Sequence, residues 1–331
     1  MTFTEKMLEK AKRDIKSILL PEATEEKVLL AAQKLVELGA AEPVLIGDPE
    51  EIAVCAGKFG VNVDGIRIID ITDEAFIDKL KTEFLAVSSD LSEKALGRRF
   101  RDPLNTGAAM VRLGYADCLA AGIARTTGEV ILCAQIFIGL KPEISVISSI
   151  GMVEFPEFKS SEGNMLCFTD CAVNAKPSSE ELADIAIVSA DTVSTLLGWE
   201  PRVGLLSFST KGSSEHEDVE RVRNAVDIIR ERRPDIKADG EFQLDAAIIP
   251  EVAEKKVKDG SDVAGRANIL VFPDLGAGNI GVKMAQIFAN AIAHGPMLQG
   301  FARPVTDFSR SAPIEEIVGN LIMLAVMAQQ N

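Results

Sequence analysis

The hydrophobic and polar positions of this chain alternate between helical and strand-like periods from the N-terminus onward. Amphipathic helices are predicted at residues 4–14 and 24–38, and short apolar strands at residues 17–21, 43–46, 66–70 and 117–121. Gly39 directly follows the second helix, at the place where a left-handed residue commonly ends a helix. This alternation of strands and helices favours a mostly parallel sheet covered by helices.

The second half of the chain continues the same pattern. Strands are expected at residues 144–149, 165–169, 203–208, 246–249 and 268–272, and helices at 178–196, 215–233, 279–293 and 313–329. One sheet built from all these strands would be unusually large, so we expect two α/β domains with a boundary near residues 139–143. The span 148–176 combines turn formers with alternating apolar residues, which predicts an antiparallel excursion.

Composition narrows the class of protein. The chain has 331 residues, 47% of them hydrophobic, which is ample for real cores. Its net charge of −15 and 5% aromatic content argue against binding to nucleic acid or to anionic membranes. The apolar stretch 317–327 is shorter than the roughly 20 residues that span a bilayer. Because Lys6, Glu9, Lys10 and Lys12 also leave no apolar signal-peptide core, we expect a cytoplasmic protein. The five scattered cysteines have no nearby histidine and form no metal-binding pattern, so we expect no metal.

One candidate site follows the strand predicted at 203–208. The segment 207–214 runs into hydroxyls, a lysine and a glycine before an acidic helix start. Thr210 and Lys211 would supply a hydroxyl and a cation for a phosphate group at a helix N-terminus. A polar cap for the helix that begins near Glu215 explains the same residues, and both interpretations stay open.

A second candidate lies at residues 271–281, where a glycine pattern follows an apolar strand. The pattern is weak as a dinucleotide signature, and we favour a tight turn whose backbone approaches a different ligand. Asn279 and Lys283 stand one helical turn apart, so both can face that ligand.

Three carboxylates occupy a short stretch before this turn. Asp239, Glu241 and Asp245 would share one face of a strand, where a hard cation could bind. We favour a solvated edge, because no further ligands accompany them.

The most informative constellation lies near the C-terminus. Ser309 and Arg310 precede a helix whose cap is expected at Ser311 or Ala312 and whose first residue is expected at Pro313. Glu315 and Glu316 therefore fall in the first helical turn, where the helix dipole favours ionised carboxylates. A guanidinium, a hydroxyl and a carboxylate at one junction suit the transfer of an acyl or phosphoryl group, although ordinary helix capping accounts for the acids equally well.

Taken together, these segments resemble the phosphate acetyl/butyryl transferase family over most of the chain. The resemblance is carried by the segments 207–214, 239–247, 265–286 and 295–310, and also by 102–104, 110–117 and 151–154. Several motifs in the same order are far more specific than any one of them.

The resemblance implies reversible transfer of a short acyl group between coenzyme A and phosphate, with coenzyme A as a substrate and no other cofactor. It also implies a fold like that of isocitrate and isopropylmalate dehydrogenases and, usually, a homodimer. The first α/β domain would comprise residues 1–142 plus 296–331 and the second residues 143–295, with the active cleft between them.

The same resemblance assigns roles to individual residues. Ser309 and Arg310 map onto the pair that stabilises the reacting carbonyl and phosphate, and Glu316 maps onto the residue that deprotonates the thiol. The run Arg125, Thr126 and Thr127 is assigned to coenzyme A, and the substrate contacts to Thr210, Lys211, Asn279 and Lys283.

Three positions depart from the family pattern. Glu316 stands where the family has Asp. At two positions where the family has arginine, this chain has none: one falls near Ala86, and the other falls near Leu132 or Cys133. Four other arginines could supply the two missing positive charges: Arg98, Arg99, Arg101 and Arg125. Leu132 and Cys133 would make the pocket more apolar, which favours an acyl group other than acetyl.

Two other functions compete with this interpretation. A non-catalytic relative would keep the fold and bind coenzyme A or an acyl phosphate without turnover. A nicotinamide-dependent dehydrogenase with a divalent metal would need the acidic cluster of Asp239, Glu241 and Asp245, and we rank it last.

Overall fold

A computed structural model describes residues 1–88 and 90–329 of the chain. The chain divides into two compact units. The first comprises residues 1–141 together with the segment from Phe301 onward, and the second comprises residues 142–300. Each unit is an α/β body with its own sheet.

The first unit is built on a five-stranded sheet in the order β11-β4-β1-β2-β3. Its strands are β1 (Ser17–Leu20), β2 (Glu42–Gly47), β3 (Arg67–Asp70), β4 (Cys118–Ala121) and β11 (Val305–Asp307). Every neighbouring pair is parallel, which confirms the mostly parallel sheet that the sequence predicts. The chain moves from β1 outward to β2 and β3 and then crosses back to β4. The strand order therefore reverses between β1 and β4.

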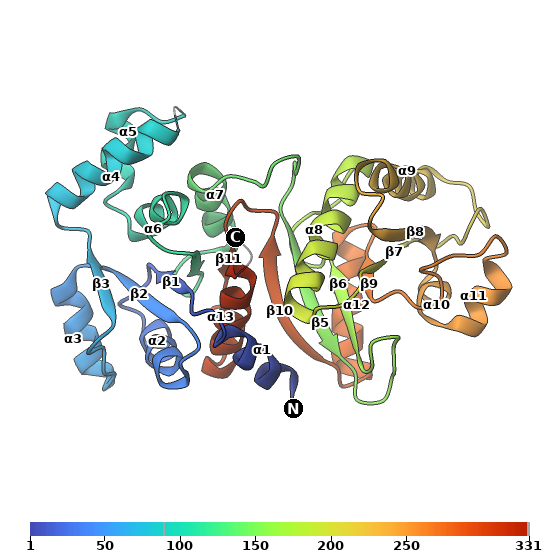
Figure 1. Cartoon of the computed structure of the whole chain (residues 1–331), viewed down its shortest axis with the longest axis horizontal. Coiled ribbons are helices and arrows are strands. Elements are labelled where there is room, and N and C mark those ends of the chain that lie inside the picture. The colour runs from blue at the N-terminus through green and yellow to red at the C-terminus, as the bar shows by residue number, and fades with distance from the viewer. Residues whose placement is uncertain (89, 330–331) are drawn as a thin grey trace. The chain divides into compact units, whose positions relative to one another are not determined.

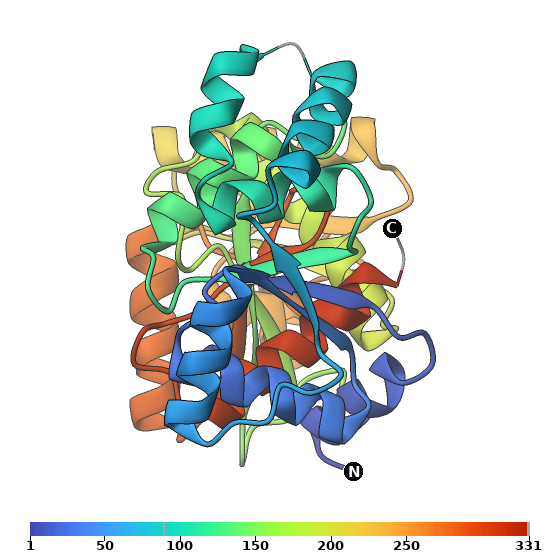
Figure 2. The same cartoon turned by 90° about the vertical axis from the view of Figure 1, so that its left-hand side faces the viewer.

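Helices cover both faces of this sheet (Figures 1 and 2). One face carries α1 (Phe3–Ala11), α2 (Glu26–Leu38), α3 (Pro49–Phe59) and the last helix, α13 (Ile314–Ala328). The other carries α6 (Pro103–Arg112) and α7 (Thr127–Phe137), with α4 (Glu74–Val87) and α5 (Glu93–Arg99) beyond them. Helix α13 packs against α1 and α2 and is apolar almost throughout, because it is buried between those helices and the sheet.

The second unit has a six-stranded sheet in the order β10-β5-β6-β9-β7-β8. Its strands are β5 (Ser148–Glu154), β6 (Met165–Thr169), β7 (Arg202–Leu206), β8 (Lys237–Phe242), β9 (Ile269–Val271) and β10 (Ile292–Gln299). Strand β5 pairs antiparallel with both β6 and β10, whereas the remaining pairs are parallel. The antiparallel excursion predicted at 148–176 is thus confirmed.

Two sets of helices pack on this second sheet (Figure 1). Helices α8 (Ser179–Leu197) and α9 (Glu217–Arg232) contact each other on one face. Helices α10 (Leu244–Ile248), α11 (Pro250–Lys256) and α12 (Leu275–Phe288) belong to the other. A core that includes Phe168, Phe242 and Phe272 lies beneath this second set.

Two predicted elements of the second unit are wrong. Residues 246–249, expected as a strand, instead form the end of the short helix α10 and its C-cap, Ile249; a run of four apolar residues cannot distinguish a strand from one helical turn. The helix expected at 279–293 begins at Leu275 and ends at Phe288, and residues 292–299 form β10. Asn290 has a φ of 50° just after that helix, and this left-handed residue turns the chain into the strand.

Within the described residues, no helix is both long and apolar enough to cross a bilayer. The same part of the chain contains no group of three or more histidine, cysteine or carboxylate residues placed to hold a metal ion.

Candidate functional site

The carboxyl ends of the strands in the first unit gather several of the predicted site residues. Ser309 and Arg310 follow β11, and Arg125, Thr126 and Thr127 follow β4. Parallel strands present their carboxyl ends at one edge of the sheet, and ligands of such folds bind outside that edge where the strand order reverses. Strands β11 and β4 are neighbours next to that reversal.

Ser309 and Arg310 lie exposed on the short loop between β11 and α13. The hydroxyl of Ser309 is 3.0 Å from that of Ser311. The ammonium of Lys27 donates to the backbone carbonyls of Arg310 at 3.0 Å and Ala312 at 2.7 Å. The loop backbone is therefore held from α2, while the side chains of Ser309 and Arg310 stay accessible.

Glu316 lies in the first turn of α13 and is exposed. The helix begins one residue later than predicted: Pro313, with a ψ of 160°, is the N-cap, and no side chain caps the helix. The prediction of a cap at Ser311 or Ala312 is therefore wrong. Glu316 keeps its predicted place near the positive end of the helix dipole.

The loop after β4 leads into α7 through a complete capping box. Thr126 accepts from the backbone N–H of Glu129, and Glu129 accepts from that of Thr126. Arg125 is 3.1 Å from Asp102 and 3.9 Å from Glu129. The pKa of Glu129 is lowered mainly by its hydrogen bonds from the backbone and hydroxyl of Thr126. The positive charges of Arg125 and Arg310 lower it further. The capping box and these two cations thus favour the ionised form of Glu129 at the start of α7.

Asp307 connects the two loops. The hydroxyl of Thr127 donates to the carboxylate of Asp307 at 2.5 Å. Asp307 lies two residues before Ser309. Burial raises the pKa of Asp307 against the lowering effect of this hydrogen bond, and the charge of Glu22 adds to the rise. Gly122 makes the close approach of β11 feasible, since a Cβ there would lie 3.3 Å from that of Asp307 and still nearer to the Phe308 backbone.

Sequence reasoning assigned no role to Glu22, Lys27 or Asp307, which organise this edge; Glu22 and Lys27 lie outside the quoted motifs, whereas Asp307 lies within the segment 295–310. The position of Asp307, two residues before Ser309, was the available signal for one of them. Glu22 follows β1 and bonds to the loop after β4, a hundred residues away, so no local pattern could reveal its partner.

The departures from the family pattern map to the first unit as well. Ala86 is exposed on the last turn of α4, and Leu132 is exposed on α7. Cys133 is buried, and its burial raises the pKa of its thiol to about 12. Arg99 stacks over the ring of Phe137 at 6.0 Å.

In the second unit, the loop 207–214 follows β7 at the carboxyl edge of the sheet. Thr210 is buried, and its hydroxyl is hydrogen-bonded with Gln243. The ammonium of Lys211 lies 2.5 Å from Asp239 and 2.8 Å from the carbonyl of Gly240. Phosphate would therefore compete with Asp239 for the Lys211 ammonium.

The acidic residues of β8 are buried and paired, so the solvated edge expected for them is wrong. Asp239 accepts from Lys211, Arg230 and Ser261. Glu241, only 1% exposed, accepts from Arg223, Ser209 and Gly212. Burial acts to raise the pKa of Glu241, but these donors outweigh it and hold the pKa at about 2. These carboxylates tie the loop 207–214 to the sheet.

The glycines of the segment 271–281 serve close packing at the start of α12. A Cβ on Gly278 would lie 3.1 Å from the Cys171 sulfur and closer still to the carbonyl of Asp170. The amide of Asn279 donates to the Cys171 carbonyl at 3.3 Å, and Lys283 is 3.4 Å from Gln286. Asn279 and Lys283 are both exposed, as a shared ligand-facing surface would require.

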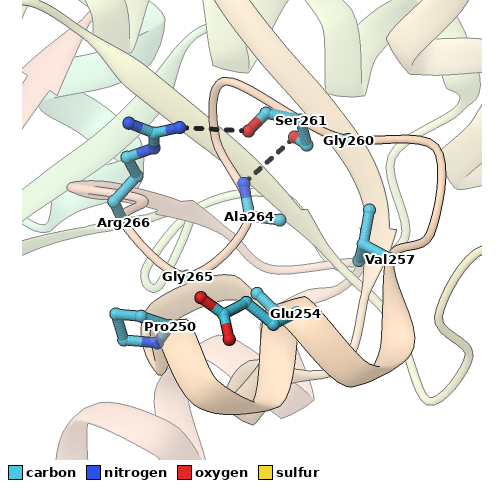
Figure 3. A pocket seen from close by; sticks show the side chains of 9 residues that line it. Pro250, Glu254, Val257, Gly260, Ser261, Ala264, Gly265 and Arg266 are labelled. Carbon is cyan, nitrogen blue, oxygen red and sulfur yellow. Dashed lines mark hydrogen bonds between the residues drawn. The ribbon is translucent and has the colours of Figure 1, made fainter.

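A separate pocket of about 420 Å³ lies between α11 and the loop that follows it (Figure 3). The Glu254 side chain stands at its centre, while the Arg266 guanidinium turns toward the Ser261 carbonyl at 3.3 Å. None of the predicted site residues lines this pocket.

Comparisons with known proteins cover nearly the whole chain. A sequence model of the family described as phosphate acetyl/butaryl transferase matches residues 2–326. The phosphate acetyltransferase of Thermoanaerobacterium thermosaccharolyticum is 43% identical over 99% of this chain and 100% of its own length. That of Clostridium acetobutylicum is 40% identical over 100% of this chain and 99% of its own.

Solved structures agree with the sequence comparison. A phosphotransacetylase from Streptococcus pyogenes covers 100% of both chains with a TM-score of 0.93 and 35% identity. A 4-hydroxythreonine-4-phosphate dehydrogenase from Klebsiella pneumoniae covers 95% of this chain and 99% of its own, with a TM-score of 0.55 at 12% identity. The second match confirms the predicted dehydrogenase-like fold and carries no statement about activity.

Proposed function

This chain belongs to the phosphate acetyl/butaryl transferase family, and we propose that it transfers a short acyl group reversibly between coenzyme A and inorganic phosphate. The observation that carries the proposal is the placement of Ser309 and Arg310 directly after β11, beside the start of α7. A hydroxyl and a guanidinium are there accessible at the carboxyl edge of a parallel sheet, where α/β folds bind their ligands.

The proposed reaction balances without any further reactant. In the direction of acyl-CoA synthesis, the thiol of coenzyme A gives its proton to Glu316 and the thiolate attacks the carbonyl carbon of the acyl phosphate. The bond between that carbon and the phosphate oxygen then breaks, and phosphate leaves with the electron pair. The proton on Glu316 returns to phosphate or solvent.

Each residue in this scheme meets a defined chemical need. A free thiol has a pKa of about 8.5 and is mostly protonated at neutral pH, so a base must raise the thiolate fraction. Arg310 would bind phosphate oxygens through its fork of N–H donors. Ser309 would donate to the oxygen of the carbonyl as negative charge develops on it.

For the remaining predicted contacts, we propose that Arg125, Thr126 and Thr127 bind coenzyme A. They begin a helix, where N–H groups and hydroxyls favour the anionic groups of such a ligand. Asn279 and Lys283 are proposed as substrate contacts on α12, and Thr210 and Lys211 as contacts on the loop after β7.

An assay over a series of acyl groups tests the proposal. Purified protein is incubated with acetyl-, propionyl- and butyryl-CoA, with and without phosphate, and release of free thiol is measured. We expect thiol release that depends on phosphate, and the ranking of the three substrates gives the acyl preference. Binding of coenzyme A in calorimetry without any turnover would instead establish the non-catalytic alternative.

We also propose that the protein is a homodimer formed through α12. Five large apolar side chains, each 53% to 78% exposed, gather on this helix and at the start of β10: Ile280, Met284, Ile287, Phe288 and Ile292. The first four are spaced along one helical face. Such a patch exposes several hundred Å², approaching the roughly 800 Å² that each partner buries in a standard interface.

Charge favours a second copy as the occupant of this patch. The chain carries a net charge of −15, so two copies repel each other over most of their surfaces. Helix α12 contains no Asp or Glu among its 14 residues. Two α12 helices can therefore meet about a twofold axis without bringing carboxylates together.

The state of the cysteines bears on where the protein works. All five are free thiols, and Cys118, Cys133 and Cys167 are buried. Unpaired thiols are typical of reducing compartments. We therefore propose that the protein acts in the cytoplasm.

A further inference from the structure

The carboxylate of Glu22 occupies a nest of backbone N–H groups at the reversal of strand order in the first sheet. Four successive residues donate to it: Gly122 at 2.9 Å and Ile123 at 2.8 Å to one oxygen, and Ala124 and Arg125, both at 2.9 Å, to the other. Glu22 itself is only 7% exposed. Every oxygen of this buried carboxylate is thus paired with backbone of a single loop.

The nest lies at the position where many α/β proteins bind the phosphate of a ligand. Glu22 lies just past the end of β1, and residues 122–125 follow β4, the neighbouring strand. Successive N–H groups before a helix form a site for the phosphate of a ligand in many α/β proteins. In this chain an internal carboxylate fills that site, so the four N–H groups are already used and the loop is fixed before any ligand binds.

A second tie fixes the same loop from the opposite neighbour of β4. Thr127 donates to Asp307 at the end of β11, and β11 and β1 flank β4 on its two sides. The backbone of 122–125 and the side chain of Thr127 are therefore held from both adjacent strands. The backbone of Arg125, which belongs to the first tie, and Thr126, which lies between the two, therefore have little freedom to move relative to the sheet.

We propose that Glu22 is a positioning residue for coenzyme A, acting through the loop 122–127; this inference rests on the proposed function of Arg125, Thr126 and Thr127. The role requires an ionised carboxylate, because only a group whose two oxygens both accept can satisfy the four converging N–H donors. An amide of the same size accepts at one oxygen and opposes two of the N–H groups with its own.

The predicted consequence is a selective loss of affinity for coenzyme A. In Glu22→Gln the loop shifts, and a shift of about 1 Å is enough to cost on the order of a hundredfold in rate. We expect the KM for coenzyme A to rise about tenfold or more, with a smaller change in the KM for acyl phosphate. Glu26→Gln, an exposed acid in the first turn of α2, is the matched control and should leave both constants unchanged.

Chemical rescue separates positioning from general damage to the fold. Glu22→Ala vacates the nest, and formate is a carboxylate small enough to enter it. Added formate should lower the raised KM of Glu22→Ala for coenzyme A toward the wild-type value, and should have no such effect on Glu22→Gln. An unchanged KM in both variants, or a loss in Glu22→Ala that formate does not reverse, would overturn the inference.

Hydrogen exchange on the unaltered protein tests the nest itself, should either variant fail to fold. The backbone N–H groups of residues 122–125 should exchange slowly, as members of the folded core do. Rapid exchange there in folded protein would overturn the inference even if acyl transfer is confirmed. Absence of acyl transfer in the unaltered protein, with slow exchange retained, would instead contradict the proposed function and leave the nest established.

Discussion

The ammonium of Lys27 holds the backbone of Arg310 from a distance of 283 residues along the chain, donating to its carbonyl at 3.0 Å. It donates to the Ala312 carbonyl as well, at 2.7 Å. The loop that presents Ser309 and Arg310 is thereby fixed to the start of α2, whereas the two functional side chains remain exposed.

Removal of this ammonium should slow turnover without unfolding the protein. In Lys27→Met the aliphatic stem remains, but the two carbonyls lose their donor and the loop gains freedom. We expect kcat to fall about tenfold or more, because positioning errors near 1 Å carry costs of that order. Thermal unfolding followed by circular dichroism should show a small change. Lys34→Met, which removes an exposed lysine paired with Glu37, serves as the control and should leave kcat intact.

Arg310 should contribute more to the rate than Glu316. Removing a donor that acts on developing charge commonly costs on the order of a hundredfold to a thousandfold in kcat, and we expect a loss of that size in Arg310→Ala. Glu316→Ala should lose less of kcat. The Glu316 side chain is one methylene longer than the family's Asp, so its carboxylate is placed less favourably and contributes less to the rate. Steady-state kinetics of both variants decide the order; equal losses, or a larger loss at Glu316, would contradict it.

The buried carboxylate of Glu241 should make stability depend on pH in the acid range. Its folded pKa of about 2 lies below the ordinary value of 4.5, so its stabilising effect is complete above pH 4.5 and is lost as the pH falls toward 2. Glu241→Gln should lower the free energy of unfolding at pH 7 by about 2 to 3 kcal/mol and flatten its decline below pH 4.5.

Urea denaturation at several pH values measures this effect. Glu200→Gln provides the comparison, because Glu200 pairs with Lys237 on the exposed surface, whereas Glu241 is buried against Arg223. That variant should unfold like the unaltered protein at every pH. A Glu241→Gln curve parallel to that of the unaltered protein between pH 4.5 and 2 would show that Glu241 is not the group responsible.

A charge on the apolar face of α12 should dissociate the proposed dimer. Phe288 is 78% exposed, and Phe288→Glu would place two carboxylates against each other across the twofold axis. Loss of such an anchor weakens association by roughly thirtyfold or more. Sedimentation at several concentrations measures it, and Val54→Glu, at an exposed apolar position on α3, is the control. If both variants sediment like the unaltered protein, this face is not the interface.

The pattern of apolar positions was sufficient for part of the architecture, but it predicts neither the helices α3–α7 and α11 nor the strands β8, β10 and β11. The strands at β1, β2, β4, β6 and β9 and the helices α2, α8, α9 and α13 lie within a few residues of their predicted bounds, because each has a clear period and recognisable ends. The segment that became α10 failed, since Ala246 and Ala247 are buried by packing that its short apolar run does not encode.

The candidate site divides in the same way. The sequence alone determined that a hydroxyl, a guanidinium and a carboxylate occur together between residues 309 and 316, since that depends only on local order. Only the tertiary structure decided that Glu22 fills the nest after β4, that Asp307 receives Thr127, and that Glu241 is buried against Arg223. The physical reason is that these pairs join residues 18 to 180 positions apart, and a hydrogen bond depends on distance in space, which the order of residues specifies only through the complete fold.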